Sequence, residues 1–258
     1  MFWNQVWIVE MSGIIMLNSD NLVFNSIHEL IDALDNSHDL GRDDSSESRG
    51  GGSWVDTYSY DEARKFMLAG KMYDGLSAEI EKYRTKGTAT KRINKLNVVG
   101  HNVVVPLYLQ GIPTCMINSK KVINNKIVTI FYSPQAPHYV DQEDLINGAS
   151  NLFKNIISLE SQGYRVNLYI LECQEGYGYC IKLKSDRETL NIKKLCFPLV
   201  SSSMLRRIGF RIKERLYRTW IGGGYGSGMF RLNEYDEFIK KNLKLRNYEI
   251  WNYEGKKK

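Results

Sequence analysis

The pattern of apolar and polar positions is most regular between residues 126 and 220. Apolar segments at 126–133 and 164–171 flank a stretch, 141–162, in which apolar residues recur at three- and four-residue spacing. The order strand, amphipathic helix, strand is typical of a βαβ unit, whose two strands run parallel in one sheet. This part of the chain therefore predicts an α/β fold.

Two further strands and a helix are predicted after the second strand. Residues 177–183 alternate between apolar and polar side chains after a short turn, which predicts an antiparallel strand at the edge of the sheet. The apolar run 192–200 predicts another strand. Ser202 or Ser203 is placed to cap a helix that we expect to reach residue 220.

Shorter signals lie at the two ends of the chain. Residues 25–34 and 59–69 each begin with a Ser-x-x-Glu capping box and carry an apolar face, which predicts two helices. The stretch 97–109 is rich in β-branched residues, and Pro106 within it marks an edge or a bend. After a glycine-rich loop, the pattern predicts a short helix and a closing strand, at 234–242 and 248–253.

Composition is that of an ordinary globular protein, but the charge is unevenly placed. The chain has 258 residues, of which 43% are hydrophobic and 25% charged, and a formal net charge of +6. Residues 201–258 carry 14 Lys and Arg against six Asp and Glu, a net charge of +8. Residues 1–200 therefore have a net charge of 6 − 8 = −2. This asymmetry indicates an acidic partner or nucleic acid for the C-terminal part, or a solvated basic face.

The cysteines and the longest apolar runs exclude two classes of protein. Cys115, Cys173, Cys180 and Cys196 match no paired zinc-binding spacing, so we expect buried free thiols and a reducing compartment. No apolar run is long enough to span a bilayer, and we expect no membrane partner. The apolar start of the chain is a poor signal peptide, and one hypothesis is that the natural protein starts at Met16.

Four blocks of sequence carry a resemblance to a known family. They are WVDTYSYDEARKFMLAG (54–70), VVGHNVVVPLYLQGIPTCM (98–116), LESQGYRVNLYIL (159–171) and FPLVSSSMLRRIGFRIKE (197–214). With the element order, they resemble an uncharacterised family of proteins from bacteriophages and related mobile elements, with a core similar to a von Willebrand factor A domain. The resemblance implies a three-layer α/β fold with a mostly parallel sheet and N-terminal α+β additions, and it supplies no activity that could be transferred to this chain.

The pattern along the chain predicts a domain organisation, and comparison with A-type domains indicates whether a metal site is expected. We expect an upstream extension (1–15), a helical segment (16–40), a flexible linker (41–53), an α+β part (54–120) and the α/β core with its basic C-terminal region (121–258). Metal-binding A-type domains have an Asp-x-Ser-x-Ser motif after the first strand. Here that place reads Tyr-Ser-Pro-Gln-Ala, and because the carboxylate is missing, we expect no metal and no other cofactor.

Candidate site residues fall into two groups. Ligands of parallel sheets bind beyond the carboxyl ends of the strands, where Ser133, Glu172 and Ser202 are expected to line a crevice. The second group lies on the helix after Ser202, where arginines at helical spacing form a stripe suited to phosphate contacts. The stripe consists of Arg207, Arg211, Arg215 and Arg218, and Arg206 beside it is a further candidate for nucleic-acid or anion binding. Helix capping and a solvated outer face are the plainer explanations of the same residues.

The sequence favours a binding protein and identifies no catalytic residue. The first hypothesis is a non-enzymatic interaction protein of a phage or mobile element with a host or phage protein partner, in the host cytoplasm or associated with the virion. The alternative is nucleic-acid binding through the basic C-terminal helix. A third reading is a metal-independent hydrolase at the carboxyl end of the sheet.

Overall fold

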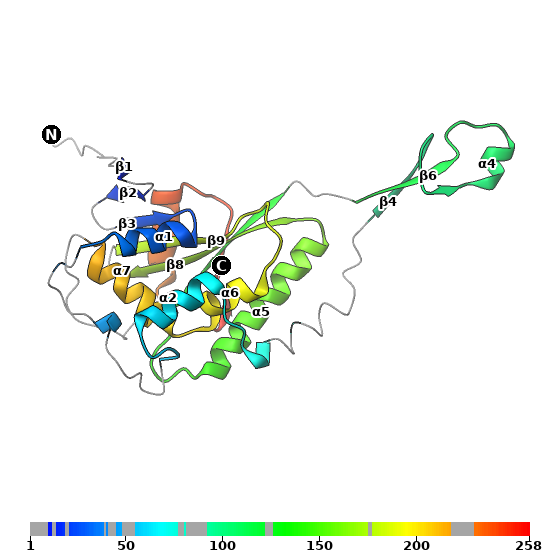
Figure 1. Ribbon diagram of the computed structural model, residues 1–258. Coiled ribbons are helices and arrows are strands. Elements are labelled where there is room, and N and C mark those ends of the chain that lie inside the picture. Colours follow the sequence, from blue (N-terminus) through cyan, green and yellow to red (C-terminus); the bar gives the residue numbers. More distant parts are fainter. Residues whose placement is uncertain are drawn as a thin grey trace, which may run out of the picture.

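The protein consists of an α/β body and a small three-stranded sheet that projects from it (Figure 1). The computed structural model confirms the predicted α/β class. It describes residues 10–11, 14–18, 21–38, 40, 45–47, 55–76, 80, 92–121, 126–174, 177–217 and 230–258.

Eight of the described strands form the main sheet, in the order β1-β2-β3-β9-β8-β7-β10-β11. At its centre β8, β7 and β10 run parallel, and β3 is parallel to β9, while the other neighbours are antiparallel. The strands are β1 (Glu10–Met11), β2 (Ile14–Asn18), β3 (Asn21–Phe24), β7 (Ile127–Tyr132), β8 (Arg165–Gln174), β9 (Tyr177–Lys184), β10 (Glu249–Asn252) and β11 (Gly255–Lys256).

The predicted βαβ unit is confirmed. Helix α5 (Gln142–Ser161) connects β7 to β8, whose residues pair from Ile127 with Arg165 onwards. Asp141 caps the helix by accepting a hydrogen bond of 3.0 Å from the backbone N–H of Asp144. Gly163 follows the helix at a φ of 87°, a conformation that favours glycine.

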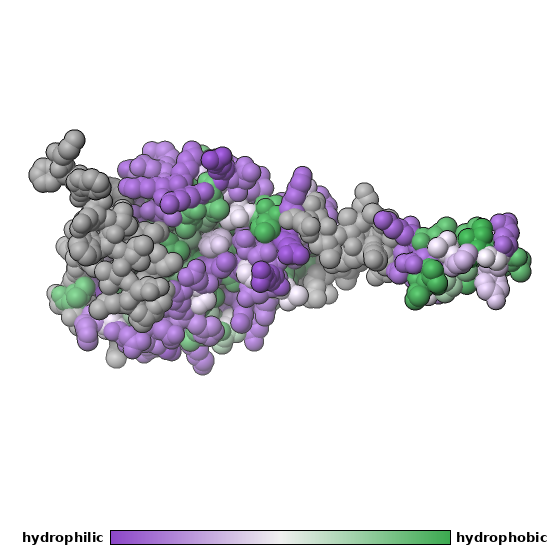
Figure 2. All heavy atoms as spheres, turned by 90° about the horizontal axis from the view of Figure 1, so that it is seen from above, coloured by the Kyte–Doolittle hydropathy of each residue, from purple (hydrophilic) through white to green (hydrophobic). Residues whose placement is uncertain are grey.

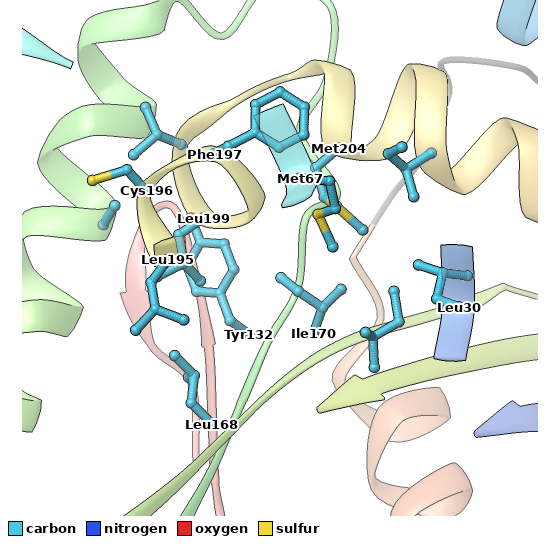
Figure 3. Packing of buried hydrophobic residues seen from close by; sticks show 14 of the residues in the cluster. Leu30, Met67, Tyr132, Leu168, Ile170, Leu195, Cys196, Phe197, Leu199 and Met204 are labelled. Atoms are coloured by element: carbon cyan, nitrogen blue, oxygen red, sulfur yellow. The ribbon is translucent and has the colours of Figure 1, made fainter. Parts of the chain in front are cut away.

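Helices cover both faces of the sheet, and each face has its own apolar cluster. On one face, α5 packs with α1 (Ile27–Asp35), α2 (Tyr60–Ala69) and α6 (Ile192–Val200) over Ile130, Leu168 and Ile170 (Figure 3). The opposite face buries Phe131 and Leu171 beneath α8 (Leu232–Phe238) and the π-helical segment η3 (Ile239–Leu243). The alternation along β7 and β8 thus assigns successive side chains to opposite layers.

The two N-terminal capping boxes form as predicted. Ser26 accepts from the N–H of Glu29 at 3.1 Å at the start of α1, and Ser59 accepts from the N–H of Glu62 at 3.2 Å at the start of α2. Gly70 ends α2 with a φ of 77°. The helix and strand predicted at the C-terminal end of the chain are also present, as α8 with η3 and as β10.

Two predictions for the sheet are wrong. Residues 192–200 form helix α6 and not a strand. Asn191 caps the helix, because its Oδ1 accepts a hydrogen bond of 3.2 Å from the backbone N–H of Lys194. Every residue from Leu195 to Val200 is buried, so the apolar run carried no period to separate strand from helix. Strand β9 is not at the edge, because β3 pairs with it on the side away from β8.

The basic helix is shorter than predicted and begins irregularly. It consists of the π-helical segment η2 (Met204–Gly209) and α7 (Phe210–Arg215), and it ends before residue 220. The glycine-rich loop predicted at 222–228 lies outside the described residues. Within the expected linker, Ser45–Glu47 form a 3₁₀ turn (η1) that lies against this helix, which corrects the expectation of a flexible chain at those three residues.

The projecting sheet, here called the arm, comprises residues 92–121. It contains β4 (Arg92–Asn97), β5 (Asn102–Val103), helix α4 (Val105–Leu109) and β6 (Met116–Lys121), with β6 in the centre of the sheet. Pro106 lies at the start of α4, so the expected strand bend is a helix start, where a missing N–H costs nothing.

Candidate interaction surface

The carboxyl ends of β7 and β8 bring Ser133 and Glu172 to one edge, but neither side chain faces solvent. The hydroxyl of Ser133 shares a hydrogen bond of 2.7 Å with the hydroxyl of Tyr235 and accepts another from the N–H of Gln135 at 3.2 Å. The N–H of Ser133 donates to the carbonyl of Trp251 at 2.8 Å. Ser133 is therefore part of the polar packing between the sheet and α8, and the predicted crevice is closed at this residue.

Glu172 is held by a lysine of α7. Its Oε1 lies 2.6 Å from Nζ of Lys213, and the carboxylate is only 2% exposed. The pKa of Tyr179 lies well above its usual value, mainly because the phenol is buried and secondly because the charge of Glu172 is close to it. This phenol therefore stays protonated. The buried ion pair fixes the basic helix to the end of β8.

Two of the three serines that precede the basic helix, Ser201 and Ser203, hold an N-terminal segment in place. The Ser201 hydroxyl donates to Oδ2 of Asp56 at 2.7 Å, and both the N–H and the hydroxyl of Thr57 donate to the Ser203 hydroxyl at 2.9 Å. Ser202 is buried, and its carbonyl accepts from the N–H of Arg206 at 3.1 Å. Ser202 of the predicted crevice thus belongs to a structural contact.

The first two candidate arginines, Arg206 and Arg207, are buried. Arg206 is 3% exposed and donates through Nη2 to the carbonyl of Ala136 at 3.2 Å, and burial lowers its pKa to about 10. Arg207 is 2% exposed, and its guanidinium donates to three backbone carbonyls at 3.1–3.2 Å. These carbonyls belong to Ser46, Thr57 and Tyr58.

Of the remaining candidate arginines, Arg211 and Arg215 lie on the described helix and Arg218 does not. Arg211 forms an ion pair of 3.1 Å with Glu47, and its guanidinium lies 4.8 Å from the ring centroid of Tyr60. Arg215 is half-buried, and Arg218 lies outside the described residues. The prediction of a contiguous arginine stripe facing solvent is therefore wrong for the described part of the helix, because its first turns are wedged between the sheet and N-terminal segments.

Glu214 completes this arrangement. The N–H of Ser46 donates to its Oε1 at 3.0 Å, and the Ser46 hydroxyl donates to its Oε2. Residues 45–47 and 56–58, here called the latch, are thus held by serines, arginines and a glutamate of residues 201–214. The polar side chains of residues 201–214 that drew attention in the sequence thus form hydrogen bonds within the body.

The arm, in contrast, presents apolar side chains to solvent, as Figure 2 shows at the end away from the body. Leu109 is 78% exposed and Val99 is 73% exposed. The exposed apolar residues of the arm are Leu96, Val98, Val99, Val103, Val105, Tyr108, Leu109 and Ile112. On other described elements, large exposed apolar residues are scattered singly, which is ordinary for a protein surface. A gathered set marks a site of interaction.

Glycines shape the tip of the arm. A Cβ on Gly100 would lie 2.3 Å from the carbonyl oxygen of Ile117, so only glycine allows the two backbones to approach. Gly111 has a φ of 70° directly after α4, and the N–H of Ile112 donates back to the carbonyl of Leu107 at 3.0 Å. The exposed residues are therefore carried on a defined backbone rather than on a random loop.

The charge of the arm and its flanks has one sign. Residues 82–140 contain nine Lys and Arg and no Asp or Glu. Residues 1–81 contain five Lys and Arg against 15 Asp and Glu. Sequence reasoning counted the C-terminal charge but missed this contrast, and the absence of acidic residues over 82–140 was the signal that could have indicated a functional surface there.

Other candidate chemistry is limited in the part of the chain that the structure describes. All four cysteines are buried and free, as predicted. No group of three His, Cys, Asp or Glu side chains is placed to hold a metal ion among the described residues. None of the described helices combines the length and the hydropathy needed to cross a bilayer.

The molecule is thus a mixed α/β domain with an apolar, basic arm. A family model, Domain of unknown function (DUF7192), matches residues 14–256, and the chain belongs to this family. The match includes the body and the arm. No curated protein and no solved structure is significantly similar to the chain.

Proposed function

We propose that the protein is a non-enzymatic binding protein of a bacteriophage or related mobile element and that its arm docks on a partner protein. The resemblance of the four sequence blocks supports the origin, and the host cytoplasm or the virion is the corresponding location. The β7–α5–β8 unit with helices on both faces of the sheet supports a core of the von Willebrand factor A type. The apolar surface of the arm supports the binding role.

The gathered exposure on the arm carries the proposal. Four side chains of the arm are largely open to water, namely Val98 and Val99 in the turn after β4 and Tyr108 and Leu109 in α4. A partner surface that covers them would remove this apolar area from water. Fully burying one such side chain contributes about 1.5–3 kcal/mol. A partner that covers even two or three of them gains enough to offset part of the cost of association.

Charge indicates the chemistry of the partner. Nine Lys and Arg without any acidic residue over 82–140 favour a surface with an apolar centre and acidic groups at its margin. The exposed side chains of the arm are mainly aliphatic, and aliphatic groups do not stack on bases as aromatic rings do. The arm therefore favours a protein over a nucleic acid.

The test compares two matched surface variants of the full chain. Val99→Ser with Leu109→Ser removes apolar surface from the arm, and Tyr139→Ser removes a side chain that is 76% exposed on the body. Proteins captured by the wild-type chain from host and phage lysates are identified, purified and titrated calorimetrically against each variant. We expect the arm variant to bind at least about tenfold more weakly and the body variant to bind like wild type. The thermal unfolding midpoints of all three proteins should agree, because the substituted side chains are exposed.

Other binding partners of the arm would be recognised by different experimental results. Equal binding of the arm and body variants by the purified partner would overturn the proposal. So would arm-dependent retention on DNA that disappears at high salt, or arm-dependent binding to vesicles of anionic lipid in the absence of a protein partner. Sedimentation velocity of the wild-type chain adds one more outcome, since arm-dependent dimers would make a second copy the occupant in place of an acidic partner.

A further inference from the structure

A separate cleft lies on the body, where the first turns of α1 and α6 meet the end of β9. Its volume is about 620 Å³, which is within the usual range for small-molecule sites. The cleft is formed by residues 25–28, Met67, Leu68, 182–185, 187–189, 191, Lys194 and Leu195. It belongs neither to the arm nor to the closed carboxyl edge of the sheet.

The floor of the cleft is apolar. Met67 and Leu195 are buried, and Ile27, Leu68 and Leu183 are partly buried against the same core. These side chains come from four elements that the tertiary fold brings together. A floor of this kind favours a ligand with an apolar body.

The rim is cationic and polar. Arg187 and Lys194 are exposed on it, and neither forms an ion pair with a described residue. The one carboxylate of the lining, Glu188, accepts through Oε2 from the N–H of Ser185 at 2.8 Å, and its single negative charge is outnumbered by the two exposed cations. Lys184 lies deeper and is neutralised by Glu160 at 2.8 Å. The charge that remains available to a ligand is positive.

The loop that carries Arg187 is fixed by its own contacts. The N–H of Asp186 donates to Oδ1 of Asn167 at 2.8 Å. The Oδ2 atom of Asp186 also forms an ion pair of 3.8 Å with Nη1 of Arg165. Nζ of Lys184 donates to the carbonyls of Val166 and Ser185 at 3.0 and 3.1 Å. Because β8 anchors the loop at these points, the rim is organised before any ligand arrives, which reduces the entropic cost of binding.

From this lining we infer that the cleft binds a small amphipathic anion, an organic carboxylate or phosphate monoester whose apolar part lies on the Ile27–Leu68–Leu183 floor and whose anionic group lies between Arg187 and Lys194. This inference is independent of the proposed docking role of the arm.

Methyl NMR of the full chain tests the inference, with phenyl phosphate, phenylacetate, inorganic phosphate and phenol as probes. We expect saturable shifts of the Ile27, Leu68 and Leu183 methyl groups with phenyl phosphate or phenylacetate, and the stronger of the two identifies the anionic group. Inorganic phosphate and phenol should each bind more weakly, because each lacks one half of the recognised chemistry. Arg187→Glu with Lys194→Glu should weaken the binding of the stronger probe by about tenfold.

The matched control reverses two exposed cations elsewhere, as Lys241→Glu with Arg246→Glu, and should retain wild-type affinity. The arm variant Val99→Ser with Leu109→Ser should also bind the probe normally. The inference is overturned if no probe gives saturable shifts at the floor methyls, if phenol or inorganic phosphate binds as tightly as the amphipathic anions, or if the Arg187→Glu, Lys194→Glu variant retains full affinity.

Discussion

Arg207→Met replaces a buried guanidinium with a neutral side chain of similar length. The guanidinium is 2% exposed and donates to the carbonyls of Ser46, Thr57 and Tyr58, so the substitution removes the charged donor that joins both parts of the latch to the basic helix. The apolar packing of the side-chain stem is largely retained in Met. The change therefore isolates the hydrogen bonds.

The expected loss of stability follows from the three acceptors. A hydrogen bond with a charged partner contributes about 1.5–3 kcal/mol, but the desolvation of the guanidinium opposes this gain, as the lowered pKa of Arg207 indicates. Some of the freed carbonyls will also reach water when the latch loosens. We therefore expect a net loss of about 3 kcal/mol. For a chain of this size, that loss lowers the unfolding midpoint by about 6–12 °C.

Circular dichroism melts and urea titrations measure this change, with Arg246→Met as the matched control. Arg246 is exposed, so its substitution should alter the free energy of unfolding by no more than about 0.5 kcal/mol. Arg207→Lys should recover only part of the loss, because one ammonium does not reproduce a planar fork that reaches three carbonyls. Limited proteolysis should show faster cleavage between residues 38 and 60 in Arg207→Met than in the control.

Two results would refute the reasoning. Unfolding midpoints of Arg207→Met and Arg246→Met that agree within about 2 °C would show that the buried hydrogen bonds do not stabilise the latch. An Arg207→Met protein of unchanged stability that loses salt-sensitive retention on DNA would return this residue to the nucleic-acid stripe predicted from the sequence.

Three further predictions concern other parts of the body. Gly148→Ala should destabilise the protein by about 2–3 kcal/mol in denaturant titrations, because its Cβ would lie 2.3 Å from the carbonyl oxygen of Tyr253, whereas at Gly75 the nearest atom is 3.6 Å away and Ala should be tolerated. Burial pushes the pKa of Asp236 up, but hydrogen bonds from two lysines and a tyrosine outweigh it and lower the pKa below its usual value. Asp236→Asn should therefore cost about 1 kcal/mol at neutral pH, and the difference from wild type in pH-dependent melts should shrink as the pH falls below about 3.9. The four buried cysteines should resist iodoacetamide in the native protein and react on unfolding, since burial raises the pKa of the Cys196 thiol to about 12, and mass spectrometry counts the adducts. Rapid native labelling, a pH-independent Asp236→Asn effect or a fully stable Gly148→Ala protein would contradict the corresponding contact.

The central βαβ unit was predictable because local and global signals agree there. Helix α5 is 20 residues long, and its cap, its amphipathic spacing and its terminal glycine all indicate the same element. Its flanking strands are apolar on both faces, as expected for strands covered by helices on both sides. The secondary structure of such a segment can be predicted from its own residues, without knowledge of what the rest of the chain contributes.

The errors arise where burial removes the period. Residues 195–200 are all buried, and such a run fits a strand as well as a short helix, with Asn191 as the local sign of a helix start. Strand β3 was missed for a related reason, since Asn21–Phe24 is four residues long and buried throughout. Without β3, the sequence placed β9 at an edge.

The arginine stripe shows a different limit of sequence reasoning. Helical spacing correctly places Arg207 and Arg211 on one face of a helix, but it does not show what covers that face. The latch lies about 150–160 positions away in the chain, and only its first part, 45–47, belongs to the stretch rich in Ser, Gly and charge that was expected to be a linker. Neither that linker nor the start of the expected α+β part gave a local sign that it would cover the arginines.

Because the arginines of the basic helix are used within the body, net charge by sequence region is a poor guide to which surface is basic. Arg206 and Arg207 belong to the region with the balance of +8, yet both are almost fully removed from solvent. The arm and its flanks instead combine cations without carboxylates and apolar side chains that are open to solvent. Because a partner contacts exposed groups, the arm is better suited than the helix to the docking role that we propose. By the same reasoning, the cationic rim around Arg187 and Lys194 is better suited than the enclosed Ser133 edge to the ligand site that we infer.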